Sequence, residues 1–225
     1  ERIISALTFS PDGGIAIKPK GVIAIEHFLV LRNIMYRTIY NHRINEISSW
    51  ILENIIKSIR NGLKDKIWID QSLFNWIFSV KDLSFDDFLA NDDVRLGYHL
   101  MRWKKEAPEP LSTLCKMFID RKLLKATDIS FLNNIQKLEL LAFTKQKCEE
   151  KNLNSSLFCG IKEKKFRGFE SNNSLKVWDG NYLINLDKAS ALVKTLMKGE
   201  DSSLLIYPEE IKDDIKKRIL LMKNR

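Results

Sequence analysis

Residues 25–43 read IEHFLVLRNIMYRTIYNHR, the stretch around which we expect the rest of the chain to be organised. It contains neither Gly nor Pro, and its apolar residues recur at intervals of three and four, which predicts a helix. At about 100° per residue, one stripe of this helix carries Arg32, Tyr36, Tyr40 and Arg43. Because apolar residues fill the neighbouring positions, we expect the helix to be buried on most sides. Buried arginine needs an anionic partner, so Arg32 should meet either a carboxylate of this chain or an anionic ligand.

The composition limits the class of protein. With 225 residues, 44% of them hydrophobic and 29% charged, the chain can form one large domain or two small ones. The net charge of +8 favours polyanionic partners, and an ordinary lysine-rich surface explains it equally well. Three cysteines without a CxxC spacing predict a reducing, cytoplasmic compartment. No run approaches the roughly 18 apolar residues of a membrane span, so we expect no membrane partner. The first residue is not Met, and we expect a fragment of a longer protein.

The N-terminal part predicts a hairpin followed by helices. Residues 2–9 and 14–18 flank the turn sequence Ser-Pro-Asp-Gly-Gly, which predicts two paired strands. Residues 44–59 predict a helix in which isoleucines at positions 47, 51, 55 and 59 form one buried ladder, either in the core or against a second subunit. Whether this helix continues the one before it, or a break occurs near Asn41, stays open.

Acidic residues gather at the start of two predicted helices. Ser84 precedes Asp86 and Asp87, and Asn91 precedes Asp92 and Asp93. Four carboxylates this close could bind a metal, but acids at a helix N-terminus are explained by capping and by the helix dipole, which we prefer. Short helices are expected at residues 72–78, 84–90, 92–106 and 111–119.

From residue 124 onward, predicted strands alternate with helices. Strands are expected at residues 124–129, 156–161, 175–178, 182–186 and 203–207, and helices at 130–151, 189–198 and 208–222. The strands at 175–178 and 182–186 flank Asp179-Gly180, which predicts a second hairpin. The fold class is therefore mainly α with a small α+β C-terminal subdomain: an N-terminal β-hairpin, long helices, then an antiparallel sheet with helices. We expect the division to fall between residues 1–122 and 123–225.

The segment LRNIMYRTIYNHR, preceded by Ala24-Ile25-Glu26, resembles the segment that follows the metal-binding core of HD-domain deoxynucleoside triphosphate triphosphohydrolases. The shared pattern is Arg, three residues, Tyr or His, three residues, Tyr, one residue, His, then a basic residue. The resemblance implies that Arg32 binds substrate phosphate, that Tyr36 lies beside the phosphates, and that Tyr40 packs against the deoxyribose. A planar guanidinium suits the first role, since it can contact two phosphate oxygens at once.

The same resemblance implies a regulatory nucleotide site. A second motif, Arg121 followed by an apolar residue and Lys125 at the end of a helix, matches basic residues that hold the phosphates of an activating nucleotide in the family. Taken alone, these cations are better explained by a helix C-terminus, where each contributes about 0.3–1 kcal/mol. Taken together with the first motif, and at the family's separation from it, they favour the regulatory interpretation. The candidate regulatory residues are Arg2, Lys18, Lys20, His42, Arg43, Arg121 and Lys125, of which Lys18 and Lys20 also fit an ordinary exposed hairpin.

The metal site of this family cannot be built from the chain. None of its three histidines, His27, His42 and His99, is followed by Asp. The resemblance implies a divalent metal in the full-length protein, with ligands outside these residues, so no metal ligand or catalytic residue is assigned here. We expect the chain alone not to hydrolyse dNTPs by that mechanism.

Two hypotheses follow. In the first, the chain is the C-terminal portion of an HD-superfamily enzyme that converts a dNTP to deoxynucleoside and triphosphate. It would supply substrate contacts, contacts to a regulatory dNTP or GTP, and the interface of a homodimer or homotetramer. In the second, it is a non-catalytic basic module that binds nucleotide or single-stranded nucleic acid, or that serves assembly; salt-sensitive binding would indicate it.

Overall fold

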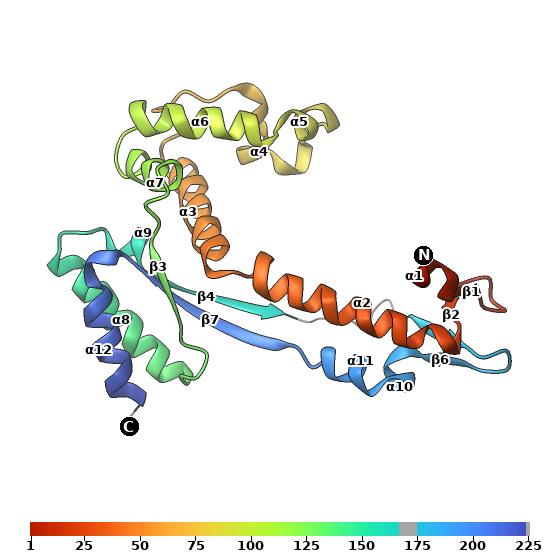
Figure 1. Ribbon diagram of the computed structural model, residues 1–225. Coiled ribbons are helices and arrows are strands. Elements are labelled where there is room, and N and C mark those ends of the chain that lie inside the picture. The colour runs from red at the N-terminus through yellow and green to blue at the C-terminus, as the bar shows by residue number, and fades with distance from the viewer. Residues whose placement is uncertain (167–174, 224–225) are drawn as a thin grey trace. The chain divides into compact units, whose positions relative to one another are not determined.

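The computed structural model describes residues 1–166 and 175–223, and it confirms the predicted fold class of a mainly α chain with a small α+β part (Figure 1). Two compact units are formed. Unit 1 contains Glu1–His42, Asp128–Phe131 and Glu163–Ser203, and unit 2 contains Arg43–Thr127, Leu132–Lys162 and Leu204–Arg225. Each unit combines distant parts of the chain, so their limits differ from the predicted division between residues 122 and 123. Whether those two ranges are separate domains stays a prediction.

Unit 1 is built on a four-stranded sheet with the order β1-β2-β5-β6. Strands β1 and β2 are antiparallel, as are β5 and β6, which confirms both predicted hairpins. Gly13 in the first turn has a φ of +80°, the left-handed conformation that glycine adopts most easily. The elements are α1 (Arg2–Ala6), β1 (Leu7–Phe9), β2 (Ile15–Ile17), the 3₁₀ helix η1 (Pro19–Gly21), α2 (Val22–Met35), the π-helix η2 (Tyr36–Tyr40), β5 (Lys176–Trp178), β6 (Leu183–Asn185), α10 (Leu186–Ala189) and α11 (Ala191–Leu196).

A parallel pair joins the two hairpins of unit 1. Ala16 of β2 lies opposite Lys176 of β5, and Ile17 lies opposite Val177. The sequence predicted only antiparallel pairing, because neither hairpin carries a local signal for the other. The buried core of unit 1 lies beneath this sheet and consists of Ile17, Ile25, Leu29, Val177, Leu186 and Val193.

The prediction of a strand from residue 2 is wrong, because residues 2–6 form the helical turn α1. A strand would direct Ile3 and Ala6 to opposite faces, whereas a helical turn directs both to one side. That side is packed closely: a Cβ added at Gly21 would lie 2.3 Å from the Cβ of Ala6. Ile3 also packs against the core of unit 1. Tertiary packing therefore overrides the β-branched composition of this segment.

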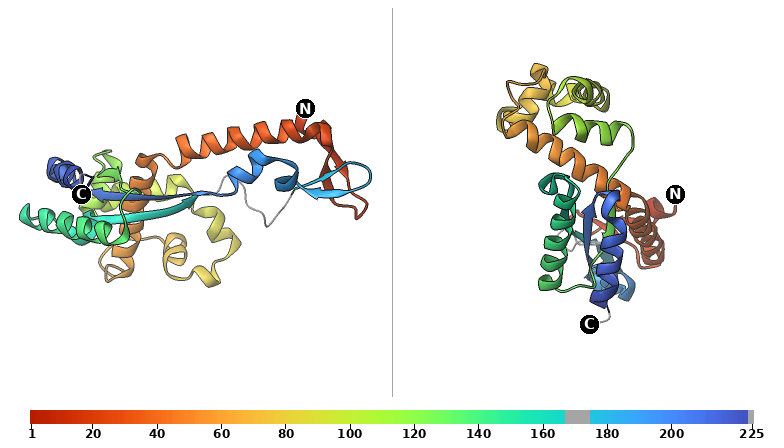
Figure 2. Two further views of the ribbon diagram at one scale, coloured as in Figure 1. Left: turned by 90° about the horizontal axis from the view of Figure 1, so that it is seen from below. Right: turned by 90° about the vertical axis from the view of Figure 1, so that its left-hand side faces the viewer.

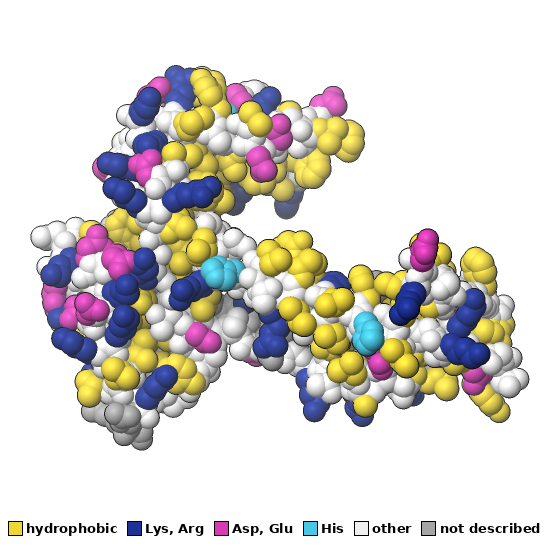
Figure 3. Space-filling view, in the orientation of Figure 1, with side chains coloured by type: hydrophobic (Ala, Val, Ile, Leu, Met, Phe, Trp, Pro, Cys, Tyr) yellow, Lys and Arg dark blue, Asp and Glu magenta, His cyan; other side chains and the backbone are white. Residues whose placement is uncertain are grey.

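The central helix forms as predicted, but its expected burial is wrong. Helix α2 continues into η2 and ends at Asn41, so the question of a break is answered: α3 starts separately at Arg43. In α2 only Ile25 and Leu29 are buried, because the small core of unit 1 covers one side. Yellow apolar side chains gather along α2 in Figure 3. The exposed ones are Ile23, Phe28, Leu31, Ile34 and Met35, and Ile39 follows in η2. Exposed apolar patches of this kind mark interaction surfaces.

Unit 2 begins with a helical bundle. Helix α7 packs against both α3 and α6, and α4 packs against α5 (Figure 1). The predicted isoleucine ladder of α3 is confirmed as core, because all four side chains are buried. The bundle consists of α3 (Arg43–Arg60), α4 (Gln71–Phe78), the 3₁₀ helix η3 (Val80–Asp82), α5 (Phe85–Ala90), α6 (Asp93–Glu106) and α7 (Leu111–Ile119).

The second half of the chain adds a three-stranded sheet with the order β3-β7-β4. Helices α8 and α12 of unit 2 lie side by side (Figure 2). The strand predicted from residue 156 starts only at Gly160, because the Asn154 side chain accepts a hydrogen bond from the Ser156 amide and starts a short helix. These elements are β3 (Lys125–Asp128), α8 (Asn134–Glu150), α9 (Ser155–Phe158), β4 (Gly160–Phe166), β7 (Glu200–Tyr207), the 3₁₀ helix η5 (Glu209–Ile211) and α12 (Lys212–Lys223). Among the described residues, no helix has the length and apolar character needed to cross a bilayer.

Candidate functional site

The predicted substrate residues form a stack at the end of α2. The guanidinium carbon of Arg32 lies 4.7 Å from the centre of the Tyr36 ring, and the rings of Tyr36 and Tyr40 are 4.9 Å apart. The helix becomes a π-helix here, since the Asn41 amide donates to the Tyr36 carbonyl, five residues earlier, at 2.8 Å. Such π turns are frequent at functional sites. The stack gives Arg32 a defined orientation while leaving Tyr40 exposed.

Arg43 does not extend this stack. The helix ends at Asn41, and Arg43 begins α3 in unit 2. The prediction of one four-residue stripe is therefore wrong beyond Tyr40, because helical spacing applies only while the helix continues. The exposed His42 lies in the two-residue link, where its amide donates to the Ile39 carbonyl at 3.3 Å.

Unit 2 contains a basic pocket of about 800 Å³. It brings together three of the predicted regulatory residues: Arg43 from the start of α3, Arg121 from the segment after α7, and Lys125 from β3. Three further cations that the sequence reasoning missed also line it, Lys122, Lys212 and Lys216. The sequence did contain a signal for two of them, because the four-residue spacing of Lys212 and Lys216 places both on one face of a helix. With Glu209 and Glu210 as the acids of the lining, the basic pocket is suited to a polyvalent anion.

The backbone at Arg121 is unusual. Its φ is +54°, which places a non-glycine residue in the left-handed region at a helix C-terminus, where glycine is normally found. The preceding Asp120 is fixed by an ion pair with Lys104 at 2.5 Å, which also holds the pKa of the Asp120 carboxyl below its ordinary value. An arginine retained in this conformation is a reason to look for a role of its side chain.

An acid and a pair of hydroxyls order the other wall of the basic pocket. The two carboxylate oxygens of Glu209 contact Lys125 Nζ at 2.5 Å and Lys212 Nζ at 2.9 Å. The hydroxyl groups of Thr127 and Tyr207 lie 2.7 Å apart and join β3 to β7. The basic pocket is therefore held by both local and long-range contacts.

The remaining regulatory candidates belong to unit 1, whereas the residues that line the basic pocket belong to unit 2. Arg2, Lys18 and Lys20 are all exposed and come from one corner, where α1 packs against η1. Lys18 Nζ donates to the Ser5 carbonyl at 3.0 Å, which ties the hairpin to α1. This contact fits the structural explanation of Lys18 that the sequence left open.

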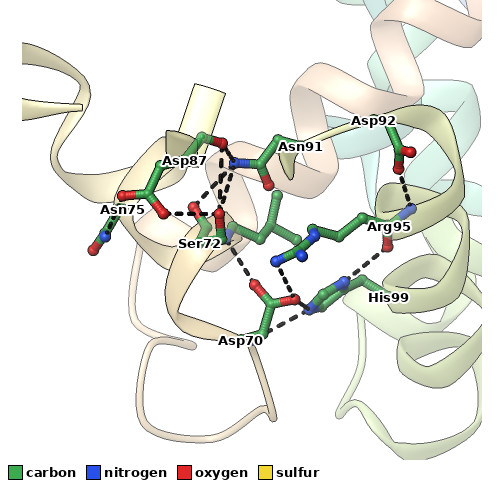
Figure 4. Close-up of polar contacts among 9 residues, drawn as sticks. Asp70, Ser72, Asn75, Asp87, Asn91, Asp92, Arg95 and His99 are labelled. Atoms are coloured by element: carbon green, nitrogen blue, oxygen red, sulfur yellow. Dashed lines mark hydrogen bonds and ion pairs between the residues drawn. The ribbon is translucent and has the colours of Figure 1, made fainter. Parts of the chain in front are cut away.

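The acidic residues between α4 and α6 lie at helix starts, in agreement with the explanation preferred from the sequence: Asp92 caps α6 (Figure 4), and Asp86, Asp87 and Asp93 lie in the first turns of α5 and α6. The Ser84 hydroxyl accepts from the Asp87 amide at 3.0 Å, and the Asp92 carboxylate accepts from the Arg95 amide at 2.8 Å. Asp87 in turn accepts hydrogen bonds from Asn75 and Ser72, both at 2.9 Å, and these lower the pKa of its carboxyl.

The same region contains a fully buried histidine (Figure 4). His99 Nδ1 lies 2.9 Å from the Arg95 carbonyl, to which it can only donate, and Nε2 accepts from the Asp70 amide at 3.2 Å. These bonds satisfy both ring nitrogens. Within residues 1–166 and 175–223, no group of three or more His, Cys, Asp or Glu side chains is arranged to hold a metal ion.

Comparisons with known proteins agree with the fold. The family described as "HD associated region" matches residues 1–221. The Bacillus subtilis protein named "Uncharacterized protein YwfO" is 29% identical over 133 residues, which are 58% of this chain and 30% of that protein. A phosphohydrolase from Bacteroides thetaiotaomicron superposes with a TM-score of 0.73 at 20% identity, covering 92% of this chain and 55% of that one. A hypothetical protein from Aquifex aeolicus gives 0.64 at 18% identity, covering 97% and 50%. This chain thus spans about half the length of these solved chains.

Proposed function

We propose, from the premise that this chain belongs to the HD-associated region family, that it is the substrate-contacting and effector-binding portion of a dNTP triphosphohydrolase. The reaction would convert a dNTP to deoxynucleoside and triphosphate. The observation that carries the proposal is the stack of Arg32, Tyr36 and Tyr40 on one helix end, in the spacing of the family motif. The Bacteroides protein that shares the fold is described as a phosphohydrolase, which supports the reaction class.

The stack suggests a division of roles. Arg32, oriented by the face of Tyr36, would contact two oxygens of the substrate triphosphate and stabilise the charge that develops there during hydrolysis. The exposed ring of Tyr40 would pack against the sugar, where it would leave no room for a 2′-hydroxyl. The pair would therefore select both a polyphosphate and a deoxyribose.

The family relationship also implies a divalent metal that activates water or polarises phosphate. The described residues do not fit this ion, since none of their acidic, histidine and cysteine side chains converge in threes. We therefore derive no step through a metal. The role proposed for this chain is to bind and orient the substrate.

The basic pocket of unit 2 would bind the phosphates of a regulatory nucleotide, a dNTP or GTP. Arg43, Arg121 and Lys125 come from three separate parts of the chain and line the same pocket. We would not expect this convergence if the three cations were an accidental surface cluster. The left-handed backbone of Arg121 adds support, because a glycine would satisfy that position more easily. Homo-oligomer formation and a cytoplasmic location are part of the same proposal.

The test is kinetic and uses the full-length gene product. Arg32→Ala should lower kcat/KM for dNTP hydrolysis by roughly 100-fold or more, as expected when a group that stabilises transition-state charge is removed. Arg37→Ala is the matched control, because it removes the same charge from the neighbouring exposed turn, and it should stay within about twofold. Unchanged kcat/KM in Arg32→Ala would refute the substrate role. Salt-sensitive binding of single-stranded DNA without any dNTP hydrolysis would instead favour the basic module.

A further inference from the structure

Glu209 contacts two lysines of the basic pocket. Its two carboxylate oxygens each contact a different lysine, Lys125 of β3 and Lys212 of α12. The contact to Lys212 is local, since the residues are three apart, but Lys125 comes from a distant strand. Helix-dipole stabilisation explains an acid at the start of η5, yet it explains Glu210 equally well. The helix dipole does not explain why Glu209 contacts lysines from both β3 and α12.

Both lysines line the basic pocket, and both already pair with a carboxylate of this chain. Lys125 is one of the residues to which we assign effector phosphate, and Lys212 lines the same pocket from α12. An incoming anion must therefore compete with the Glu209 carboxylate for each ammonium group. All three side chains are roughly half exposed, at 43% for Lys125, 38% for Lys212 and 51% for Glu209. Ion pairs this exposed are weak, so the carboxylate can be displaced.

We propose that Glu209 is an internal counter-ion that pairs with two lysines of the basic pocket in the absence of effector and is displaced from them when a polyphosphate binds. This inference rests on the proposed effector role of the basic pocket. Because the carboxylate contacts both lysines, an incoming anion gains binding free energy only if it replaces both contacts at once. Triphosphate can span two lysines, whereas orthophosphate is too small to compensate for both. Glu209 would thus favour nucleoside triphosphates over the orthophosphate that is abundant in cells.

The experiment titrates inorganic triphosphate, and separately orthophosphate, into this chain by calorimetry at fixed ionic strength. Glu209→Gln should bind triphosphate about three- to tenfold more tightly than wild type, as expected when two exposed ion pairs need not be broken. Its preference for triphosphate over orthophosphate should also fall. Glu210→Gln removes the same charge from the adjacent residue of the lining, and it should change the triphosphate Kd by less than about twofold.

A second variant separates geometry from charge. Glu209→Asp keeps the net charge but is one methylene shorter, so it cannot reach both lysines, and it should also bind triphosphate more tightly than wild type. Circular dichroism checks that each variant is folded. Equal affinities of wild type and Glu209→Gln, or an equal gain in Glu210→Gln, would overturn the inference while leaving the effector role of the basic pocket intact. Absence of triphosphate binding in wild type and both Glu209 variants would refute that role and this inference together, whereas the substrate role of Arg32 is tested separately by hydrolysis.

Discussion

Replacing Arg121 by glycine should make the protein more stable and less able to bind polyphosphate. The φ of +54° at this residue lies in the left-handed region, which costs a side-chain-bearing residue roughly 1–2 kcal/mol relative to its ordinary conformation. Glycine removes this strain but adds about 0.4–1 kcal/mol of conformational entropy to the unfolded chain. The difference predicts that Arg121→Gly raises the free energy of unfolding by about 0.5–1 kcal/mol.

The same substitution should weaken binding to the basic pocket. A hydrogen bond to a charged group contributes about 1.5–3 kcal/mol, so loss of the guanidinium predicts a triphosphate Kd roughly 10- to 100-fold higher. Chemical denaturation measures the first effect and calorimetric titration the second. A gain in stability together with a loss of triphosphate affinity would indicate that Arg121 serves binding rather than folding.

Lys122→Gly is the control, because the adjacent residue also lines the basic pocket but has no positive φ. Glycine there should lower stability by up to about 1 kcal/mol, since no strain is relieved. A destabilised Arg121→Gly would contradict the argument from backbone strain. A stabilised Arg121→Gly with unchanged triphosphate affinity would show that the arginine is not a phosphate ligand.

Three further predictions concern the framework. Gly160→Ala should destabilise the fold by about 1–3 kcal/mol, because the added Cβ would lie 2.1 Å from the Trp50 ring. Gly97→Ala should stabilise the fold by about 0.5–1 kcal/mol, because Gly97 lies within α6 and its added Cβ would meet open space. Urea denaturation compares the two variants. Since hydrogen bonds lower the pKa of Asp87 below 3.8, its contribution is complete above that pH and is lost as the pH falls through the lowered value. Acid titrations should therefore show Asp87→Asn less stable than wild type at pH 6, with the difference shrinking below pH 3.8; a constant difference would contradict this. Burial raises the pKa of Cys115 to about 12, so a disulfide reagent at pH 8 should label this thiol only after unfolding, and rapid labelling of the native chain would contradict the buried position.

Local signals in the sequence predicted most helices of this chain. The isoleucine ladder of α3 and the cap at Ser84 depend only on residues a few positions apart, and the structure has them as expected. The cap of α6 is Asp92, one residue later than the sequence predicted. Both hairpins were predicted for the same reason, since both turns carry Asp and Gly. Sequence periodicity therefore predicts the elements whose formation depends on residues close together in the chain.

Features that depend on distant residues were missed. The parallel pairing of β2 with β5, and the convergence of Arg121 with Lys212, join segments that no periodicity connects. The burial of α2 was overestimated because its composition shows that an apolar face exists, but not what covers it. The substrate and regulatory roles of the candidate residues remain predictions that the proposed experiments test.

The pairing of Ala16 with Lys176 sets an order of events during synthesis. The first hairpin is made well before β5, because residues 15–17 precede their pairing partners at residues 176–178 by a long stretch of chain. Until then Ile17 and Leu29, which end up buried, have no complete core to enter. The nascent chain must therefore carry the exposed apolar side chains of β2 and α2 until β5 has been made. We expect its yield in cells to depend on chaperones that bind emerging hydrophobic segments, and to fall when translation slows between the codons of β2 and those of β5.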